Sequence, residues 1–139
     1  MSDMTKKFGP RSSAEAYRKT DVMTANRETI LLMMYAGAIR FLKAAIEASD
    51  TNNLPEKSKM IDKTQGIILE LRSTLNFDVG GDIARSLELL YAFISQRLIQ
   101  ASSPGIVDPL KEALAILVTL NEGWEQAIAN LRKEKTKTE

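Results

Sequence analysis

The chain has 139 residues, a nearly balanced charge with 19 basic and 18 acidic side chains, and neither cysteine nor histidine. A chain of this length suits one domain whose core needs no disulfide or metal. Without cysteine or histidine there is no thiolate nucleophile, no imidazole base, no zinc-finger site and no Glu-x-x-His di-iron pair. We therefore expect a protein that is not an enzyme and that uses no cofactor or metal.

The charges are spread evenly along the chain. Residues 1–50 carry eight basic and six acidic side chains, residues 51–100 six of each, and the remainder five and six. Nucleic-acid binding requires a basic stripe that neutralises phosphates, and the sequence contains none. The pair Gly80-Gly81 alone is too little for a phosphate-binding loop. The pattern predicts a protein that binds no nucleic acid.

The N-terminal region does not resemble a targeting or membrane segment. Residues 1–20 are polar and lack the apolar stretch of a signal peptide. The most apolar run, Ile30 to Leu42 (ILLMMYAGAIRFL), has thirteen residues, fewer than the about 20 that cross a bilayer. Without cysteine, nothing requires an oxidising compartment. We expect a cytoplasmic protein with no membrane insertion.

Four helices are predicted in chain order after a polar leader. Asn26 and Asp82 are typical N-caps, and Pro55 and Pro109 are typical of the first turn of a helix. The expected helices cover residues 26–49, 55–76, 82–101 and 108–132. We expect residues 1–20 to be a flexible leader with a capping segment, residues 21–132 to be the bundle, and residues 133–139 to be a disordered tail.

Each predicted helix has apolar residues at spacings of three and four, which make one of its faces apolar. Because the connections are short, neighbouring helices must run antiparallel. The expected fold is all-α, an antiparallel up-down four-helix bundle. Gly37, in the middle of the first helix, predicts a close approach between two helices. The predicted core consists of Leu31, Met34, Ala38, Phe41, Leu42, Ala45, Met60, Ile61, Ile67, Ile68, Leu71, Leu75, Ile83, Leu87, Leu90, Tyr91, Ile94, Leu98, Leu110, Leu114, Leu117, Leu120, Trp124, Ile128 and Leu131.

Several apolar residues lie outside these faces. One such side chain means little, but a group of them is typical of an interaction surface. Ordinary packing, including cover by the leader, is the alternative for each of them. Tyr17 belongs either to a disordered leader or to a short segment that caps this surface. The residues outside the apolar faces are Leu32, Met33, Tyr35 and Ile39 in the first helix, Leu69 in the second, and Leu89 and Phe93 in the third.

A series of short motifs follows in order along the chain: Ala16-Tyr17, Val22-Met23-Thr24-Ala25, Leu31 to Tyr35, Gly37 to Leu42, Leu75-Asn76-Phe77-Asp78, Gly80-Gly81, Leu90-Tyr91, and Trp124 with Ala127. Together they resemble the FliS family, the flagellin export chaperones of bacterial flagellar assembly. The resemblance covers roughly residues 16–131. It departs from the family pattern at Ala36, where an acidic or amide residue is common, and at Asn26-Arg27, where Ser-Pro is frequent.

The resemblance implies that the protein binds the disordered C-terminal region of flagellin, prevents its premature polymerisation in the cytoplasm and aids its delivery to the flagellar export gate. It also implies an export-gate component and a co-chaperone as further partners. An apolar groove on a helical bundle can accept such a segment as a helix. Two alternatives stay open: a homo-oligomeric bundle, including a weak homodimer, or an adaptor that sequesters another amphipathic peptide, such as an anti-sigma factor or a co-chaperone. The expected partner contacts are Tyr17, Leu32, Met33, Tyr35, Ile39, Leu69, Leu89 and Phe93.

Overall fold

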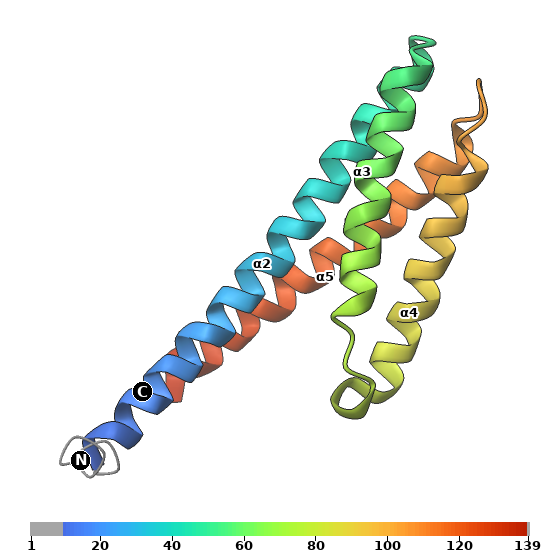
Figure 1. Ribbon diagram of the computed structural model, residues 1–139. Helices are drawn as coiled ribbons and strands as arrows, with labels where there is room; N and C mark the ends of the chain where they lie inside the picture. Colours follow the sequence, from blue (N-terminus) through green and yellow to red (C-terminus); the bar gives the residue numbers. More distant parts are fainter. Residues whose placement is uncertain (1–9, 139) are drawn as a thin grey trace, which may run out of the picture. The chain divides into compact units, whose positions relative to one another are not determined.

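The computed structural model describes the backbone of residues 10–138 and the side chains of residues 22–24 and 26–137. Within residues 10–138 the chain forms four α-helices and no strand, which confirms the predicted all-α bundle (Figure 1). The helices are α2 (Pro10–Asp50), α3 (Leu54–Ser73), α4 (Phe77–Gln100) and α5 (Asp108–Thr138). The chain divides into two compact units between Leu31 and Leu32, and the larger unit, Leu32–Glu139, contains the bundle.

The first and last helices are longer than the sequence pattern predicts. α2 begins at Pro10 rather than near Asn26, because residues 11–25 contain no glycine or proline that would stop a helix. α5 continues to Thr138, where a disordered tail is expected from residue 133. Lysine, arginine and glutamate are good helix formers, and basic side chains suit the last turn of a helix. The domain limits at residues 20 and 132 stay predictions.

α4 begins at Phe77 rather than at residue 82 as expected, and it is interrupted. Its N-cap is Asn76, whose side-chain oxygen accepts hydrogen bonds from the N–H groups of Asp78 and Val79 at 3.1 Å each. Gly81 then has φ 50° and ψ −123°, which is not helical. Glycine tolerates this positive φ, and a side chain there would be strained. Asp82, the predicted cap, therefore follows this break instead of starting the helix.

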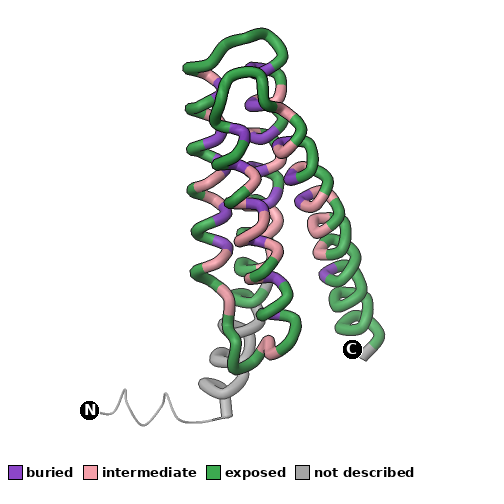
Figure 2. Tube along the Cα trace, turned by 90° about the vertical axis from the view of Figure 1, so that its right-hand side faces the viewer, coloured by how far each residue is buried: buried purple, intermediate pink, exposed green. Residues whose placement is uncertain are grey.

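The larger unit buries most of the predicted core (Figure 2). Gly37 packs closely on α3, since a Cβ at this position would lie 3.3 Å from Cδ1 of Ile67, which confirms the predicted close approach. Two core predictions are wrong: the side chains of Ile83 and Leu131 are 70% and 49% exposed. The predicted core residues that are buried are Ala38, Leu42, Ala45, Ile61, Ile68, Leu71, Leu87, Tyr91, Ile94, Leu98, Leu110, Leu117 and Ile128.

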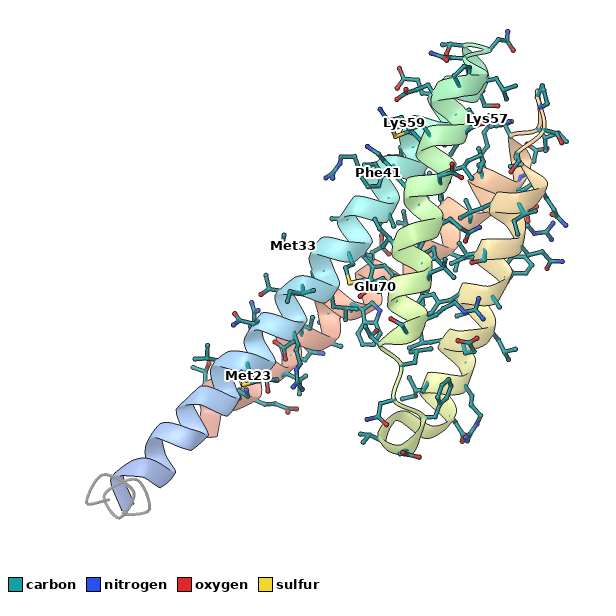
Figure 3. The ribbon with its side chains drawn as sticks, viewed as in Figure 1. Met23, Met33, Phe41, Lys57, Lys59 and Glu70 are labelled. Atoms are coloured by element: carbon teal, nitrogen blue, oxygen red, sulfur yellow. The ribbon has the colours of Figure 1, made fainter. Side chains whose placement is uncertain are left out.

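Polar side chains that an apolar pattern does not reveal are buried as well. The hydroxyl groups of Tyr35 on α2 and Tyr91 on α4 are hydrogen-bonded to each other. Lys57 on α3 is 1% exposed, and its Nζ donates to the carbonyl oxygens of Ser103 and Ile106 at 2.9 Å each. Lys57 therefore ties α3 to the loop that connects α4 with α5 (Figure 3).

The stretch Val22–Asp50 is long and apolar enough to cross a membrane when judged by length and composition alone. The core helix of a bundle meets the same criteria. The second half of this stretch contributes the side chains of Tyr35, Ala38 and Leu42 to the bundle core, where each is 0% exposed. We therefore assign the stretch to a core helix.

Candidate functional site

An apolar groove lies on the surface between α4 and α5. It has a volume of about 320 Å³ and is lined by Leu90 of α4 and by Ala115, Ile116, Thr119 and Leu120 of α5. No charged side chain lines it. The side chains that the structure describes include no cluster of acidic residues able to hold a metal ion. A groove of this chemistry accepts the apolar face of a helix.

An ion pair fixes how α4 and α5 are aligned at one end of this groove. Nε of Arg97 on α4 lies 3.1 Å from Oε2 of Glu112 on α5. Leu90 precedes Arg97 by seven residues, and Thr119 follows Glu112 by seven residues. Leu90 and Thr119 line the groove together. The two helices are therefore antiparallel and in constant register from the ion pair to the groove.

Beyond the opposite end of the groove, the backbones of α4 and α5 separate. α5 diverges from α4 as it passes the end of the bundle that carries the α3–α4 connection, as both views show (Figures 1 and 2). Ile83 on α4 and Leu131 on α5 both lie toward this end, and both are exposed. A closed bundle would bury these two side chains, so the divergence explains why their prediction as core residues is wrong.

Small side chains form the outer edge of the groove on α5. Ala115, Thr119, Gly123 and Ala127 are spaced by four residues, which places them along one strip of the helix, and all four are exposed. A Cβ at Gly123 would meet no atom within 4 Å. Small residues allow the backbone of another helix to approach closely. The edge on α5 therefore leaves room for a partner helix to lie against the groove.

Two of the predicted contacts flank the groove on α4. Leu89, next to the groove-lining Leu90, is 73% exposed. Phe93 is partly buried, and the guanidinium carbon of Arg97 lies 4.6 Å from the centre of its ring. Leu89 and Phe93 are thus within one turn of the groove-lining Leu90 on α4, although neither is among the residues that line the groove.

Four other predicted contacts lie outside the groove. Met33 of α2 and Leu69 of α3 are 68% and 54% exposed. Leu32 and Ile39 are partly buried. Because Gly37 faces α3, Leu32 and Ile39 lie on the flank of α2 that faces away from α3. None of the four lines the α4–α5 groove.

Tyr35 is placed in the core, and its prediction as a residue outside the apolar face of its helix is wrong. Its side chain is 0% exposed because the ring packs inward and the hydroxyl finds a partner in Tyr91. Burial raises the pKa of both tyrosines, and the hydrogen bond with Tyr35 raises the pKa of Tyr91 further. The indole N–H of Trp124 on α5 also lowers the pKa of Tyr35, although its geometry falls short of a good hydrogen bond. The side chain of Tyr17 lies outside the described residues.

Sequence reasoning missed most of the groove lining on α5. Leu120 was assigned to the core, while Ala115, Ile116 and Thr119 were not assigned to any surface. The spacing of small residues by four from Ala115 to Ala127 is the signal that could have indicated this edge. Small residues at this spacing are common in helices, however, so the signal becomes specific only next to an apolar groove.

In the part of the chain that the structure describes, an all-α bundle carries an apolar groove between two of its helices, an arrangement typical of proteins that bind a partner helix. The chain belongs to the FliS family: the model of the family described as flagellar protein FliS matches residues 10–131. This is a family of flagellar secretion chaperones, so membership implies a chaperone rather than an enzyme.

Individual relatives agree with this assignment. The flagellar secretion chaperone FliS of Bacillus subtilis (strain 168) is 30% identical over 120 residues, which cover 86% of this chain and 89% of that protein. The protein of the same name from Vibrio cholerae serotype O1 is 33% identical over 120 residues, covering 84% of this chain and 88% of that protein. A crystal structure of a flagellar chaperone from bacteria has the same fold, with a TM-score of 0.74 at 24% identity, and covers 88% of this chain and 99% of that chain.

Proposed function

We propose that the protein binds the disordered C-terminal segment of flagellin in the cytoplasm, prevents its premature polymerisation and aids its delivery to the flagellar export gate. The observation that carries this proposal is the apolar groove between α4 and α5, together with the exposed side chains of Ile83 and Leu131 on the same two helices. Relatives of similar length are flagellar secretion chaperones, which supports flagellin as the partner.

The groove explains how binding and protection from polymerisation are linked. An amphipathic segment that is disordered alone can become a helix when its apolar face enters the groove. The apolar face that is buried in this way is not available to a second flagellin molecule. A flagellin segment is therefore either bound to the chaperone or available for self-assembly. Assembly is delayed for as long as the segment stays bound to the chaperone.

The groove is too small to account for all of the binding. Coupled folding of a disordered segment typically buries about 1,000–3,000 Å² and costs about 2–5 kcal/mol in ordering. We therefore assign further contacts to the exposed side chains of Met33 and Leu69 and to the partly buried Leu32 and Ile39. A segment that extends beyond the groove could reach these residues in turn. Cover of this surface by the leader around Tyr17 stays a prediction.

Calorimetric titration with a peptide of the flagellin C-terminal segment tests the proposal. We expect one-to-one binding with a large negative heat-capacity change, because apolar surface becomes buried. Leu89→Asp should weaken binding strongly. Ile99→Asp is the matched control, because Ile99 is also on α4 and is 67% exposed. It lies three turns along the helix from Glu88, which pairs with Arg72 of α3, so it faces away from the groove.

The outcome separates this function from the alternatives. A folded wild-type protein that does not bind the peptide would contradict the proposal. Sedimentation that changes with protein concentration in the absence of any peptide would favour a homodimer or larger oligomer. Binding of an anti-sigma factor or a co-chaperone in place of flagellin would favour the adaptor. Contact between the loaded chaperone and an export-gate component is a further proposal, which pull-down with and without bound flagellin would test.

A further inference from the structure

Arg97 makes three interactions at the end of the groove nearest the α4–α5 loop. Its guanidinium carbon lies 4.6 Å from the centre of the Phe93 ring, within the range of a cation–π contact. Its Nε lies 3.1 Å from Oε2 of Glu112 on α5, and its Nη1 donates to Oε1 of Gln100 at 2.7 Å. The side chain is 31% exposed, so it is held close to the surface of the bundle instead of extending into solvent.

The register of the two helices places Phe93 beside the groove. Phe93 lies between Leu90 and Arg97 on α4, and Ile116 lies between Glu112 and Thr119 on α5. Because Arg97 pairs with Glu112 and Leu90 lines the groove together with Thr119, the antiparallel register places Phe93 at the level of Ile116, which lines the groove. The Phe93 ring is not itself among the residues that line the groove, and this register places it between Leu90 and the ion pair.

A second arginine on the same helix shows what an ordinary surface pair looks like. Arg85 pairs with Asp82 three residues earlier, and their side chains are 63% and 96% exposed. Such exposed pairs contribute little to stability. Arg97 differs because it joins two helices and covers an aromatic ring, so its effect extends to the shape of the groove.

We propose that Arg97 is a positioning residue that holds the Phe93 ring beside the groove and closes the groove at this end. The proposal rests on the proposed function, because the groove is taken to bind the flagellin segment. The guanidinium group occupies one face of the ring and limits the rotation of the side chain, while the other face stays available to the bound segment. A ring that is ordered before binding loses less entropy when the partner arrives.

A double-mutant cycle tests whether Arg97 acts through Phe93. Arg97→Met keeps the aliphatic part of the side chain and removes the charged, planar guanidinium group. We expect it to lower the affinity for the flagellin peptide about 3- to 30-fold. Phe93→Leu should lower the affinity for the peptide to a similar extent. The double variant should bind no worse than Phe93→Leu alone, because Arg97 has no ring left to position. Arg85→Met is the matched control and should leave the affinity unchanged.

A charge exchange separates positioning from stability. Arg97→Glu combined with Glu112→Arg restores an ion pair between α4 and α5 but removes the cation from the Phe93 ring. We expect the variant with exchanged charges to have the urea midpoint of unfolding of the wild type but a lower affinity for the peptide than the wild type. Recovery of both quantities would overturn the proposal, and so would an Arg97→Met affinity equal to that of the wild type. If the wild-type protein does not bind the peptide, the proposed function itself fails, and the inference fails with it.

Discussion

The hydroxyl groups of Tyr91 on α4 and Tyr35 on α2 are hydrogen-bonded to each other, and both rings are almost completely excluded from solvent. The bond joins two helices that are not neighbours in the sequence. A buried hydroxyl pair is satisfied only when both helices have one particular alignment. It therefore selects one packing of α2 against α4 among the several that apolar side chains alone would allow.

Removing one hydroxyl should destabilise the bundle more than removing both. Tyr91→Phe leaves the buried hydroxyl of Tyr35 without its partner, and we expect it to lower the free energy of unfolding by about 1–3 kcal/mol. Tyr35→Phe should act in the same direction. The double variant should lose less than the sum of the two single variants, because no hydroxyl of the pair is left. Urea unfolding measures all three, and additive losses would contradict the expected coupling.

The same pair should make stability depend on pH in the alkaline range. Burial raises the pKa of Tyr35 and of Tyr91 above the ordinary value of 10.0. The unfolded chain ionises these groups near pH 10, whereas the folded protein keeps them protonated. Their contribution to stability is therefore complete below pH 10 and is lost as the pH rises through 10 toward the higher pKa values of the folded state.

The contribution of the two tyrosines to the pH dependence of stability can be separated from that of Lys57. Burial lowers the pKa of Lys57 below its ordinary value of 10.5, so the folded state loses this proton first and Lys57 favours folding as the pH rises toward 10.5. This opposes the tyrosine contribution in the wild type. We subtract the free energy of unfolding of the double variant Tyr35→Phe/Tyr91→Phe from that of the wild type. The contribution of Lys57 cancels in this difference, because both proteins contain Lys57. We expect this difference to fall above pH 10, and a constant difference would contradict the assignment.

Lys57 should hold the α4–α5 loop in place. Lys57→Met keeps most of the side-chain volume and removes both hydrogen bonds to the carbonyl oxygens of Ser103 and Ile106. We expect a loss of about 1–3 kcal/mol in the free energy of unfolding and faster hydrogen exchange in the loop. Lys59→Met is the matched control, because Lys59 is exposed on the same helix (Figure 3), and it should change neither quantity. Equal effects of the two variants would show that Lys57 contributes only through its stem.

Alanine substitutions at two glycines distinguish an effect on protein stability from an effect on partner binding. Gly66 on α3 and Gly123 on α5 are exposed, and a Cβ at either would meet no atom within 4 Å. Alanine at either position should stabilise the protein by about 0.5–1 kcal/mol. Gly66→Ala should leave flagellin-peptide affinity unchanged, whereas Gly123→Ala should weaken it because Gly123 continues the strip of small residues that begins at the groove-lining Ala115 and Thr119. Unchanged affinity in both variants would show that a bound helix does not approach this edge closely.

The fold could be predicted because the apolar periodicity of each helix is strong and the connections are short. Gly37 also predicted a close helix contact that Ile67 confirms. The helix ends were harder, since nothing between residues 11 and 25 stops a helix and Asn26 is tolerated inside one. Buried polar groups such as Tyr35 and Lys57 were missed because periodicity measures apolar character and cannot identify a hydrogen-bond partner that is distant in the sequence.

The candidate site could be predicted only in part. Leu89 and Phe93 were predicted as partner contacts because they lie outside the core face of their helix, and both stay predictions. Ile83 and Leu131 were assigned to the core because they lie on that face, and no sequence pattern indicates that α4 and α5 diverge beside them. Divergence depends on the packing of whole helices. The two errors in the core assignment therefore fall where these two helices diverge.

Lys57 and Arg97 both act at the end of the bundle that carries the α4–α5 loop, whereas α5 diverges from α4 toward the opposite end (Figure 2). A further widening between these two helices would then be a rotation about the end that carries the loop. Displacement grows in proportion to distance from a pivot, and Leu131 lies about 18 Å farther along the helix axis than Thr119. A small angle that barely moves Thr119 thus shifts Leu131 appreciably. We expect partner segments of different bulk to be accommodated with their smallest side chains near the pivot and their largest near the free end.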